Sequence, residues 1–550
     1  MKNPSLRFRL LRSAIALAIV AGSSFAAAPL GASAASHSAY AASRLQTANK
    51  VTSIRHAPAA ASASRGGRLR STGISTSPAS GQSAGERAAG SQLINAFNGV
   101  SSKDSEITNF GARFEPPDQG LCAGNGFVIE PVNSAYTIYR TDGTPIAGPF
   151  NVNDLFHRDG LAFTSDPRCY YDPSTNTWFA TILFISTDAN GNFTNQGTID
   201  ISVNTSGDPT TPWTTYSIDT SDAANTANGC PCFGDQPRLG IDNFNLYLST
   251  DEFSILGPNF NGAQLYAVAK SDLVNLRSSI RFVQFSDPHI NGNSVISVQP
   301  ATTNSPADAE YWLSDMDVNF DGAVHNQIAV WAMTHRDIAN GETPVLSNTV
   351  IGSEGFSVPP NAPQKGSRTL ITTNDDRMQQ TQFVNGTIWG ELSTALQVGS
   401  NRSANVAAAW FNVHPTLSGD VIGSAAMTGQ GYVALSGNDV LFPALQADQA
   451  GNAAMVFTVT GNGRYPSAAF ATKSARQSNF GPISITAEGT SSYVPKPGVP
   501  GRWGDYSYAS LDLGDGTMWL ATEYVPPITS QTSNGQRNWG TEVIHVRLGG

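Results

Sequence analysis

The feature that most constrains the fold is a short pattern that recurs at long intervals along the chain. Each copy has an acid, an amide or a proline at the start of a predicted strand, then a turn, then an aromatic residue on the next strand. The copies are centred on Asp118, Asp166, Asp235, Gln299, Arg377, Pro443 and Asp505, and successive centres are 48 to 78 residues apart. A repeat of this length, built from strands alone, is typical of the four-stranded blade of a β-propeller.

The last copy of the pattern is the clearest. Residues 501–507 read Gly-Arg-Trp-Gly-Asp-Tyr-Ser, and residues 511–522 follow as a strand, a tight turn and a second strand. Asp505 stands at the start of the first strand, Asp512 enters the turn, and Trp519 opens the return strand.

The composition of the body from about residue 92 fits an all-β fold. Runs of four to eight β-forming residues alternate with Gly, Asn, Asp and Pro turns, and no stretch has the 3.6-residue period of an amphipathic helix. The prediction is a β-propeller of about seven four-stranded blades, with six or eight blades left open. The final strand, Glu542–Arg547, is expected to pair into the first blade and so remove exposed sheet edges. Two tandem β-sandwiches are the competing architecture.

The first ninety residues differ from the body. Lys2, Arg7, Arg9 and Arg12 precede a short apolar run and small-residue cleavage sites, so residues 1–34 are predicted to be a secretory signal peptide. Residues 35–90 are rich in Ala, Ser, Gly and Arg and nearly lack large apolar side chains, so they are predicted to be a disordered linker or propeptide. Residues 91–550 then form the β-propeller domain. The protein is expected to be secreted, extracellular or periplasmic, with its signal peptide cleaved.

The charge distribution narrows the choice of partners. Residues 1–90 carry 11 of the 32 Lys and Arg residues and one of the 42 acids, which leaves 21 basic and 41 acidic residues in the body. A body this acidic is not expected to bind nucleic acid or anionic membranes. No later stretch is apolar enough to span a bilayer. The expected partners are an extracellular glycan or a cell-surface protein, and the expected state is a monomer.

The four cysteines, Cys122, Cys169, Cys230 and Cys232, predict two disulfides in an exported chain. They allow three connectivities. A Cys230–Cys232 bridge would close a very small ring. The favoured pairings are therefore those without this bridge, or Cys122–Cys169 with the Cys-Pro-Cys left reduced or strained.

Residues 510–519, Ser-Leu-Asp-Leu-Gly-Asp-Gly-Thr-Met-Trp, are similar to the Asp-box of sialidase-like propellers. Together with Pro116-Pro117-Asp118, Ser165-Asp166-Pro167 and residues 502–507, they make the region of roughly 110–548 resemble a group of exported bacterial sialidase-like proteins, most of them uncharacterised. The resemblance implies a propeller fold and leaves Ser510, Asp512, Gly514 and Trp519 as fold residues. Its implication for activity is weaker, because propellers host many functions.

In a propeller the first strands of the blades start near the central axis, where ligands usually bind. Asp118, Asp166, Asp235 and Asp505 are expected to meet there, together with Arg168, Arg238, Arg377, Arg464 and Arg502. A sialidase-like site requires arginines that hold a carboxylate, a Tyr nucleophile with a Glu partner, and an Asp acid. The resemblance implies Asp166, Asp505 and Tyr506 as catalytic residues, and Arg168, Arg238, Arg502, Asp118 and Asp235 as substrate-binding residues. Glu523 is expected to lie on the wrong strand to serve as the Glu partner.

A simpler interpretation of the same residues remains open. The acids would hydrogen-bond backbone N–H groups of the neighbouring blade, and the arginines would neutralise them inside the ring. The function hypotheses are therefore a glycoside hydrolase of sialidase-like type acting on acidic or complex glycans, a non-catalytic propeller that binds glycan or protein, and a purely structural domain.

A cation site is also predicted. Asp315, Asp317, Asn319 and Asp321 place oxygen ligands at alternating positions before Gly322, as calcium-binding loops do. Ca2+ is therefore the one candidate cofactor, with a hairpin turn capped by Asx side chains as the alternative. The histidines, including His325, are scattered and are predicted to be surface or strand residues.

Overall fold

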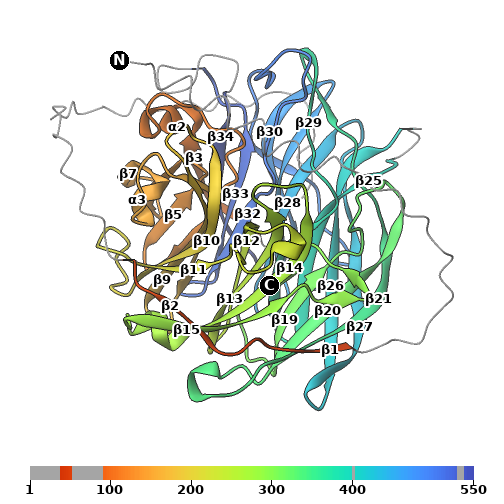
Figure 1. Ribbon diagram of the computed structural model, residues 1–550. Coiled ribbons are helices and arrows are strands. Elements are labelled where there is room, and N and C mark those ends of the chain that lie inside the picture. Colours follow the sequence, from red (N-terminus) through yellow and green to blue (C-terminus); the bar gives the residue numbers. More distant parts are fainter. Residues whose placement is uncertain (1–37, 52–90, 399–402, 529–537, 550) are drawn as a thin grey trace.

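The computed structural model describes residues 38–51, 91–398, 403–528 and 538–549 (Figure 1). Strands dominate these residues, and the helices among them are short. The helices are α2 (Ser102–Thr108), α3 (Val152–Leu155) and α4 (Lys270–Val274), with 3-10 turns η2 (Thr226–Asn228) and η3 (Ile338–Asn340). The prediction of a mostly β chain is confirmed. The predicted signal peptide, residues 1–34, lies outside the described residues.

Most of the described strands form seven antiparallel groups of four. The first three groups are β4 (Cys122–Gly124), β5 (Phe127–Pro131), β6 (Ala135–Arg140) and β7 (Pro145–Asn151); β8 (Phe163–Asp172), β9 (Thr177–Thr187), β10 (Phe193–Asn204) and β11 (Thr214–Asp219); and β12 (Cys232–Ile241), β13 (Asn245–Ser254), β14 (Phe260–Ala269) and β15 (Ser279–Ser286).

The next two groups are β18 (Gln299–Thr303), β19 (Glu310–Ser314), β20 (His325–Thr334) and β21 (Val345–Phe356); and β24 (Met378–Val384), β25 (Thr387–Leu396), β26 (Asn405–Ser418) and β27 (Val421–Val433). The last two are β28 (Asp439–Ala447), β29 (Ala453–Gly461), β30 (Arg464–Lys473) and β31 (Ser484–Ala487); and β32 (Tyr508–Asp512), β33 (Thr517–Tyr524), β34 (Gly540–Arg547) and β3 (Gln92–Ser101). Two short hairpins, β16 (His289–Ile290) with β17 (Asn293–Ser294) and β22 (Ala362–Gln364) with β23 (Ser367–Ile371), lie between groups.

The first strands of the groups contact one another in order: β4, β8, β12, β18, β24, β28, β32, and β32 in turn contacts β4. Two of these contacts include parallel pairing, at Ile241 with Thr302 and at Ala301 with Thr381. Through this pairing the third, fourth and fifth groups share one continuous sheet. The starts of the first strands are therefore brought together at one end of the structure.

Apolar clusters fill the space between neighbouring groups. Between the second and third groups, Phe179 and Ile201 pack with Leu248 and Tyr266. A corresponding cluster joins the last group to the first, where Trp519 and Val543 pack with Val128 and Leu121. Burying both faces of every sheet in this way accounts for the near-continuous apolar runs in the strands.

The recurring sequence pattern marks the first strands. Asp166, Asp235, Gln299 and Pro443 lie within β8, β12, β18 and β28, while Asp118, Arg377 and Asp505 come shortly before β4, β24 and β32. The expected strand, turn and strand of the last copy are also found. The carboxylate of Asp512 accepts the Gly514 N–H in the turn between β32 and β33, and the Trp519 side chain is fully buried.

The expected pairing of the final strand is wrong. Residues Glu542–Arg547 lie in β34, which pairs with β33 and with the N-terminal strand β3, and not within the group β4–β7. The register places Gln92 opposite Arg547. It is therefore the N-terminal segment that completes the last sheet. This pairing spans almost the whole body of the chain and has no local sequence signal.

Part of the segment expected to be disordered is ordered. Strand β1 (Ser38–Ala41) pairs with β21, and β2 (Gln46–Asn49) pairs with β15, so both extend outer edges of sheets (Figure 1). The Tyr40 ring lies 6.1 Å from that of Trp331, and Ala48 is buried. Backbone pairing with existing edges offsets the low apolar content of these residues. Residues 52–90 lie outside the described residues.

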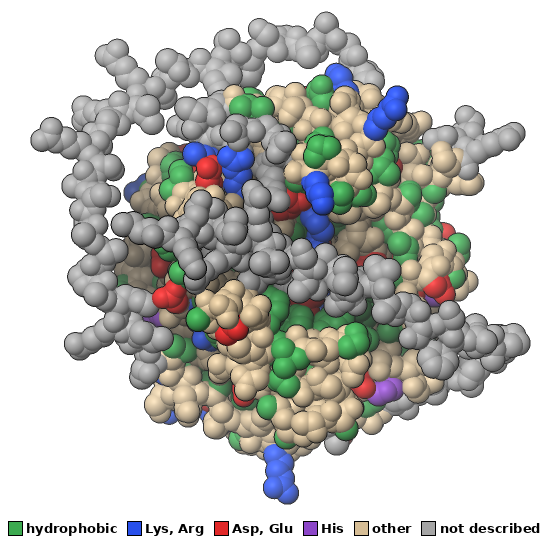
Figure 2. All heavy atoms as spheres, turned by 45° about the horizontal axis from the view of Figure 1, so that its top comes forward, with side chains coloured by type: hydrophobic (Ala, Val, Ile, Leu, Met, Phe, Trp, Pro, Cys, Tyr) green, Lys and Arg blue, Asp and Glu red, His purple; other side chains and the backbone are tan. Residues whose placement is uncertain are grey.

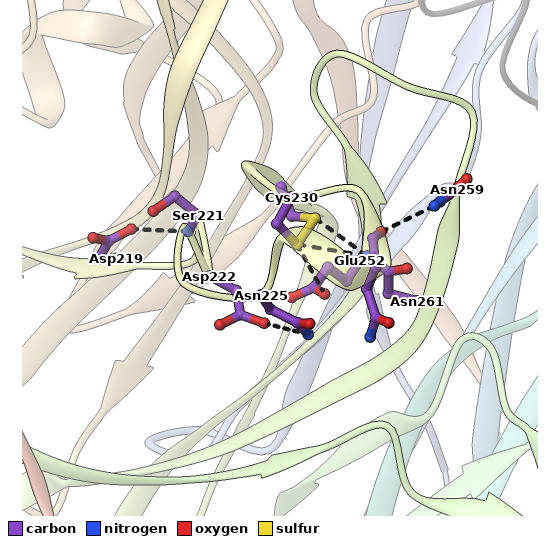
Figure 3. The surroundings of a disulfide bond; sticks show 10 residues. Asp219, Ser221, Asp222, Asn225, Cys230, Glu252, Asn259 and Asn261 are labelled. Carbon is purple, nitrogen blue, oxygen red and sulfur yellow. Dashed lines mark hydrogen bonds between the residues drawn. A yellow bond between two sulfur atoms is a disulfide. The ribbon is translucent and has the colours of Figure 1, made fainter.

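Two disulfides are present, Cys122–Cys169 and Cys230–Cys232. The first joins β4 to β8. The second, which the expected pairings disfavoured, also forms, because its two Cα atoms lie 4.5 Å apart, within the range that a disulfide spans. Asn261 donates to the sulfur of Cys232 at 3.2 Å, and the buried Glu252 lies beside the bridge (Figure 3).

The surface view agrees with the low charge content. On the face shown in Figure 2, acidic and basic side chains are interspersed among uncharged ones. No helix within the described residues has the length and apolar character that crossing a membrane requires.

Candidate functional site

A cavity of about 170 Å³ lies where the starts of several first strands meet. Its lining includes Asp118, Asp166, Asp235, Asp505 and Arg502, all of which the sequence predicted to converge. Phe114, Phe163 and Phe233 supply apolar surface, and further polar lining comes from Glu115, Asn133, Thr164, Ser165, Asn374 and Arg377. The cavity is smaller than the roughly 300–1,000 Å³ of typical drug-sized sites, which fits a small ligand or a single ring of a larger one.

Several residues of the cavity lining lie at points where the backbone departs from regular strand geometry. Asp118 and Asp166 both have positive φ angles, 46° and 59°, in the left-handed region that residues with a Cβ rarely adopt. At Asp166 the register of β8 against β9 also shifts between Ser165 and Arg168, which is a β-bulge. The same combination recurs at Gln236 in β12. Strained residues of this kind concentrate at functional sites, because they persist only where the surrounding structure holds them.

Asp505 is held from two directions. Nη2 of Arg502 donates to both of its carboxylate oxygens at 2.8 Å, and its own backbone N–H donates to Asp118 Oδ1 at 2.8 Å. The Asp505 side chain keeps 18% of its surface exposed, so it is fixed without being sealed off. An ion pair in which one guanidinium nitrogen contacts both carboxylate oxygens fixes the orientation of the carboxylate.

Asp166 is supported by a buried aromatic layer. The hydroxyl of Tyr506 donates to Asp166 Oδ1 at 2.7 Å, and the guanidinium carbon of Arg168 lies 3.3 Å from the centre of the Tyr506 ring. Neither Arg168 nor Tyr506 lines the cavity, and Tyr506 is only 3% exposed. Burial also raises the pKa of the Tyr506 hydroxyl well above its usual range. In this arrangement Tyr506 positions Asp166 and has no open path to a ligand.

The cavity carboxylates differ in their electrostatic surroundings. Burial, followed by the negative charges of Asp505 and Asp166, raises the pKa of Asp118 well above its usual range. Burial and the charge of Asp505 also raise the pKa of Asp166. Asp235 is only partly buried, and burial together with the charge of Asp166 raises its pKa to about 7. One partly accessible carboxyl group with a pKa near neutral therefore lies in the same cavity as Asp505, which is paired with Arg502.

Three of the five predicted arginines, Arg168, Arg238 and Arg464, do not line the cavity. Arg238 is 1% exposed and donates to Gln236, Asp251 and Ser297 behind it. Arg464 pairs instead with Glu488 on the surface. The three-arginine site implied by Arg168, Arg238 and Arg502 is therefore not assembled. Arg377 does line the cavity, but its guanidinium is already paired with Asp375 at 2.6 Å.

Glu523, which was expected to lie on the wrong strand to serve in the site, does not line the cavity. It is 2% exposed, neither carboxylate oxygen has a hydrogen-bond partner among the described residues, and burial with the charges of Asp118 and Asp505 raises its pKa well above its usual range. A Cβ on Gly504 would lie 2.4 Å from its Oε1, so the glycine of the Arg-Trp-Gly-Asp stretch leaves room for this carboxyl group. Glu523 thus lies close to Asp118 and Asp505 without lining the cavity itself.

The predicted cation loop connects β19 to β20. Asp315 is fully hydrogen-bonded, since its oxygens accept the backbone N–H groups of Asp317 and Met378 at 3.0 and 3.1 Å. The Asn319 side chain is exposed, and its backbone N–H donates to Asp317. Asp317 and Asp321 do come together, and they meet His325, which the sequence analysis treated as a surface or strand histidine.

A second cavity of about 240 Å³ lies at the opposite ends of the first strands, where Asp172 ends β8 and Asp242 follows β12. The basic side chains of its lining already form ion pairs: Lys270 pairs with Asp172 at 3.1 Å, and Arg336 pairs with Asp242. Although larger, this cavity holds its lining charges in structural ion pairs. The 170 Å³ cavity remains the better candidate for ligand binding.

Comparisons with known proteins yield structural neighbours of low similarity. No family model and no curated protein matches the chain. An exo-β-1,3-galactanase from Clostridium thermocellum has a TM-score of 0.29 at 10% identity, covering 84% of this chain and 97% of its own. The Trypanosoma rangeli sialidase in complex with the inhibitor DANA has 0.31 at 9%, covering 78% and 58%. The N-terminal domain of Nup159 has 0.30 at 10%, covering 84% and 97%. Similarities at this level identify neither the fold family nor the activity of the chain.

Proposed function

We propose that the 170 Å³ cavity binds a neutral sugar and hydrolyses its glycosidic bond, with Asp235 as general acid and Asp505 as the second carboxylate. The observation that carries the proposal is the pairing of a partly buried carboxyl group with a pKa near 7 and a carboxylate held by Arg502 in one cavity. Glycoside hydrolysis uses two carboxyl groups whose surroundings separate their protonation states in this way.

The roles follow from the surroundings of each group. Asp235 would protonate the leaving-group oxygen, and Asp505 would activate a water or attack the sugar carbon. Asp118 and Asp166 act as positioning residues, because each is hydrogen-bonded by a neighbour, Asn133 at 2.7 Å and Tyr506 at 2.7 Å. The phenylalanines of the lining would pack against the apolar face of the sugar ring.

A neutral substrate fits better than an acidic one. The cavity lining contains five carboxyl groups, including Glu115, and two arginines, Arg377 and Arg502. Both arginines are already paired with aspartates. A substrate carboxylate would meet no free guanidinium and an excess of like charge. The sialidase-like mechanism with Tyr506 as nucleophile is correspondingly less favoured, since that hydroxyl faces Asp166 and not the cavity.

The architecture we propose for this site is a closed β-propeller of seven four-stranded blades. Its support is the cyclic order of contacts from β4 through β32 back to β4, together with the apolar cluster between the last and first groups. The Asp512–Trp519 turn would then be a blade turn of Asp-box type. Two disulfides are consistent with an oxidising compartment, so the proposal includes export to the periplasm or the outside of the cell.

The test is hydrolysis of a panel of neutral and acidic oligosaccharides, measured as new reducing ends. Wild-type protein should cleave at least one neutral member, and Asp505→Asn and Asp235→Asn should each lose most of that activity. Asp308→Asn, at an exposed acid away from the cavity, should retain it. Cleavage confined to sialic-acid-containing members would overturn the choice of substrate.

The alternative is a non-catalytic propeller that binds glycan or protein. The observation that favours it is the extent to which the cavity acids already serve the structure, as when Asp118 accepts the Asp505 N–H. Retention on a glycan array without cleavage of any oligosaccharide would select this alternative. The absence of both binding and cleavage would direct the search to a protein partner.

A further inference from the structure

A cluster of metal-ligating groups lies in the loop before β20, separate from the cavity lining. One ligand atom each from Asp317, Asp321 and His325 lie within 4.8 Å of one another. Nε2 of His325 is 3.4 Å from Asp317 Oδ2 and 3.9 Å from Asp321 Oδ1. Ligands at 2.0–2.2 Å from a tetrahedral zinc ion are separated by about 3.3–3.6 Å, so these spacings are close to what such an ion requires.

The hydrogen bonding of Asp317 leaves one oxygen for a ligand. Its Oδ1 accepts the backbone N–H groups of Asn319 and Phe320, at 3.2 and 2.7 Å. Its Oδ2 is buried and has no hydrogen-bond partner among the described residues, and the same holds for Nε2 of His325. The Asp317 residue is only 1% exposed. A buried carboxylate oxygen and a buried imidazole nitrogen that face each other without a hydrogen bond are costly unless something joins them.

A further buried acid lies next to the cluster. Asp376 is fully buried, and neither of its carboxylate oxygens has a partner among the described residues. Asp315 connects the loop to the start of β24, since it accepts the N–H of Asp317 at one oxygen and that of Met378 at the other. A cation at the cluster would offset the negative charge that these acids concentrate.

We propose that Asp317, Asp321 and His325 bind a divalent transition-metal ion of the zinc type, with water completing its coordination. The site differs from the calcium loop expected from the sequence. It contains an imidazole nitrogen, whereas calcium prefers six to eight oxygen ligands, and Asn319 takes no part through its side chain. The side chains of His325 and Asp321 are 26% and 58% exposed, so the ion can enter from solvent.

The position of the site gives the ion a structural role. Phe320, in the same loop, lies under the guanidinium of Arg377 with its ring centre 5.6 Å from the guanidinium carbon. Arg377 lines the 170 Å³ cavity, and Asp375, Asp376 and Arg377 are consecutive residues. Binding of the ion therefore orders one wall of the cavity from behind. This proposal does not depend on the reaction proposed above.

The test uses the full chain without a polyhistidine tag, because a tag would bind zinc itself. The protein is stripped with a chelator and titrated with Zn2+, Mn2+ and Ca2+ by calorimetry, and bound metal is counted by elemental analysis. We expect one Zn2+ per chain and a rise of several degrees in Tm on zinc addition, since an ion that binds only the folded state stabilises it. No binding of Zn2+, or binding of Ca2+ in preference to it, overturns the proposal.

Variants locate the ion. His325→Gln and Asp317→Asn should each weaken zinc binding by more than about 100-fold, since removing even an outer-shell partner costs 10–100-fold. The matched control is His335→Gln, because His335 also pairs with an aspartate, Asp420 at 3.0 Å, but belongs to no three-residue cluster among the described residues. Equal loss in the control, or unchanged binding in the two site variants, would mean that the ion lies elsewhere. Circular dichroism of each stripped variant shows that it remains folded.

Discussion

The backbone N–H of Asp505 donates to Asp118 Oδ1 at 2.8 Å and so connects the start of the last sheet to the start of the first, across 387 residues. Asp118 Oδ2 accepts at the same time from the Asn133 side chain at 2.7 Å. A single carboxylate therefore fixes the geometry of Asp505 in the cavity and contributes to the junction between the two ends of the body.

Replacing Asp118 by Ala should lower the free energy of unfolding by about 1–3 kcal/mol, because the Asp505 N–H and the Asn133 amide lose their acceptor in a buried place. Denaturant unfolding measures the change. Asp308→Ala, at an exposed acid, should stay within about 0.5 kcal/mol of wild type. Equal stability of the two variants would show that the Asp118 hydrogen bonds contribute nothing measurable to the free energy of unfolding.

Replacing Tyr506 by Phe removes the donor to Asp166 and keeps the ring beneath Arg168. The expected cost is about 0.5–1.5 kcal/mol of stability, with a drop in the glycan hydrolysis rate that reflects a displaced Asp166. The comparison variant is Tyr465→Phe, whose hydroxyl makes no hydrogen bond to a described residue and whose ring lies near Lys365 at the surface. If Tyr506 were the nucleophile, the Phe variant would be inactive and not merely slower.

The hydrolysis rate should fall as the pH rises through about 7. Asp235 has a pKa raised to about 7, and a general acid works only while it is protonated. A rate that keeps rising between pH 7 and pH 9 would exclude Asp235 from that role. The measurement is kcat/KM against pH on the best oligosaccharide of the panel.

Stability should be higher at pH 5 than at pH 8. Burial raises the pKa of Glu130 and Glu252 to about 7 and that of Glu542 to about 8, against roughly 4.3 in the unfolded chain. Because the folded state binds protons more tightly at these sites, it is favoured below about pH 4 and loses that advantage as the pH rises to 8. Thermal unfolding at both pH values should show a Tm several degrees higher at pH 5, and Glu542→Gln should reduce the difference.

The two disulfides should contribute unequally. Cys122 and Cys169 are separated by 47 residues and Cys230 and Cys232 by 2, and the entropy removed from the unfolded chain grows with loop length. Converting the first pair to Ser should cost about 4 kcal/mol, and converting the second should cost about 1–2 kcal/mol. Unfolding of the two double variants measures both values under the same conditions. A larger loss at the Cys230–Cys232 pair would point to a role for its neighbours Asn261 and Glu252.

The sequence predicted the features that depend on residues close together in the chain, such as the positions of the first strands. The first strand of each group could be located because a turn residue, a proline and a later aromatic recur near it, as at Asp166, Pro167 and Trp178. The convergence of Asp118, Asp235 and Asp505 followed from those positions. None of this required knowledge of which strand pairs with which.

What depends on distant pairing was not predictable. Arg238 forms an ion pair with Asp251 and therefore does not line the cavity. Asp251 lies opposite Asp235 because of the register of β12 against β13, which the sequence does not specify. Glu523 could be placed behind the cavity only once the contacts around Asp118 and Gly504 were known. His325 was set aside because an isolated histidine has no spacing signal, although the turn after Asp317 brings it to Asp321.

The addition of β3 to the last sheet has a consequence for how the chain is made. Gln92 must leave the ribosome more than 450 residues before its partner, Arg547. Until β34 has been made, the segment that will become β3 lacks the strand with which it pairs. Completion of this sheet therefore waits for residues 540–547, and any chain released before them carries unpaired strand edges that other chains can join.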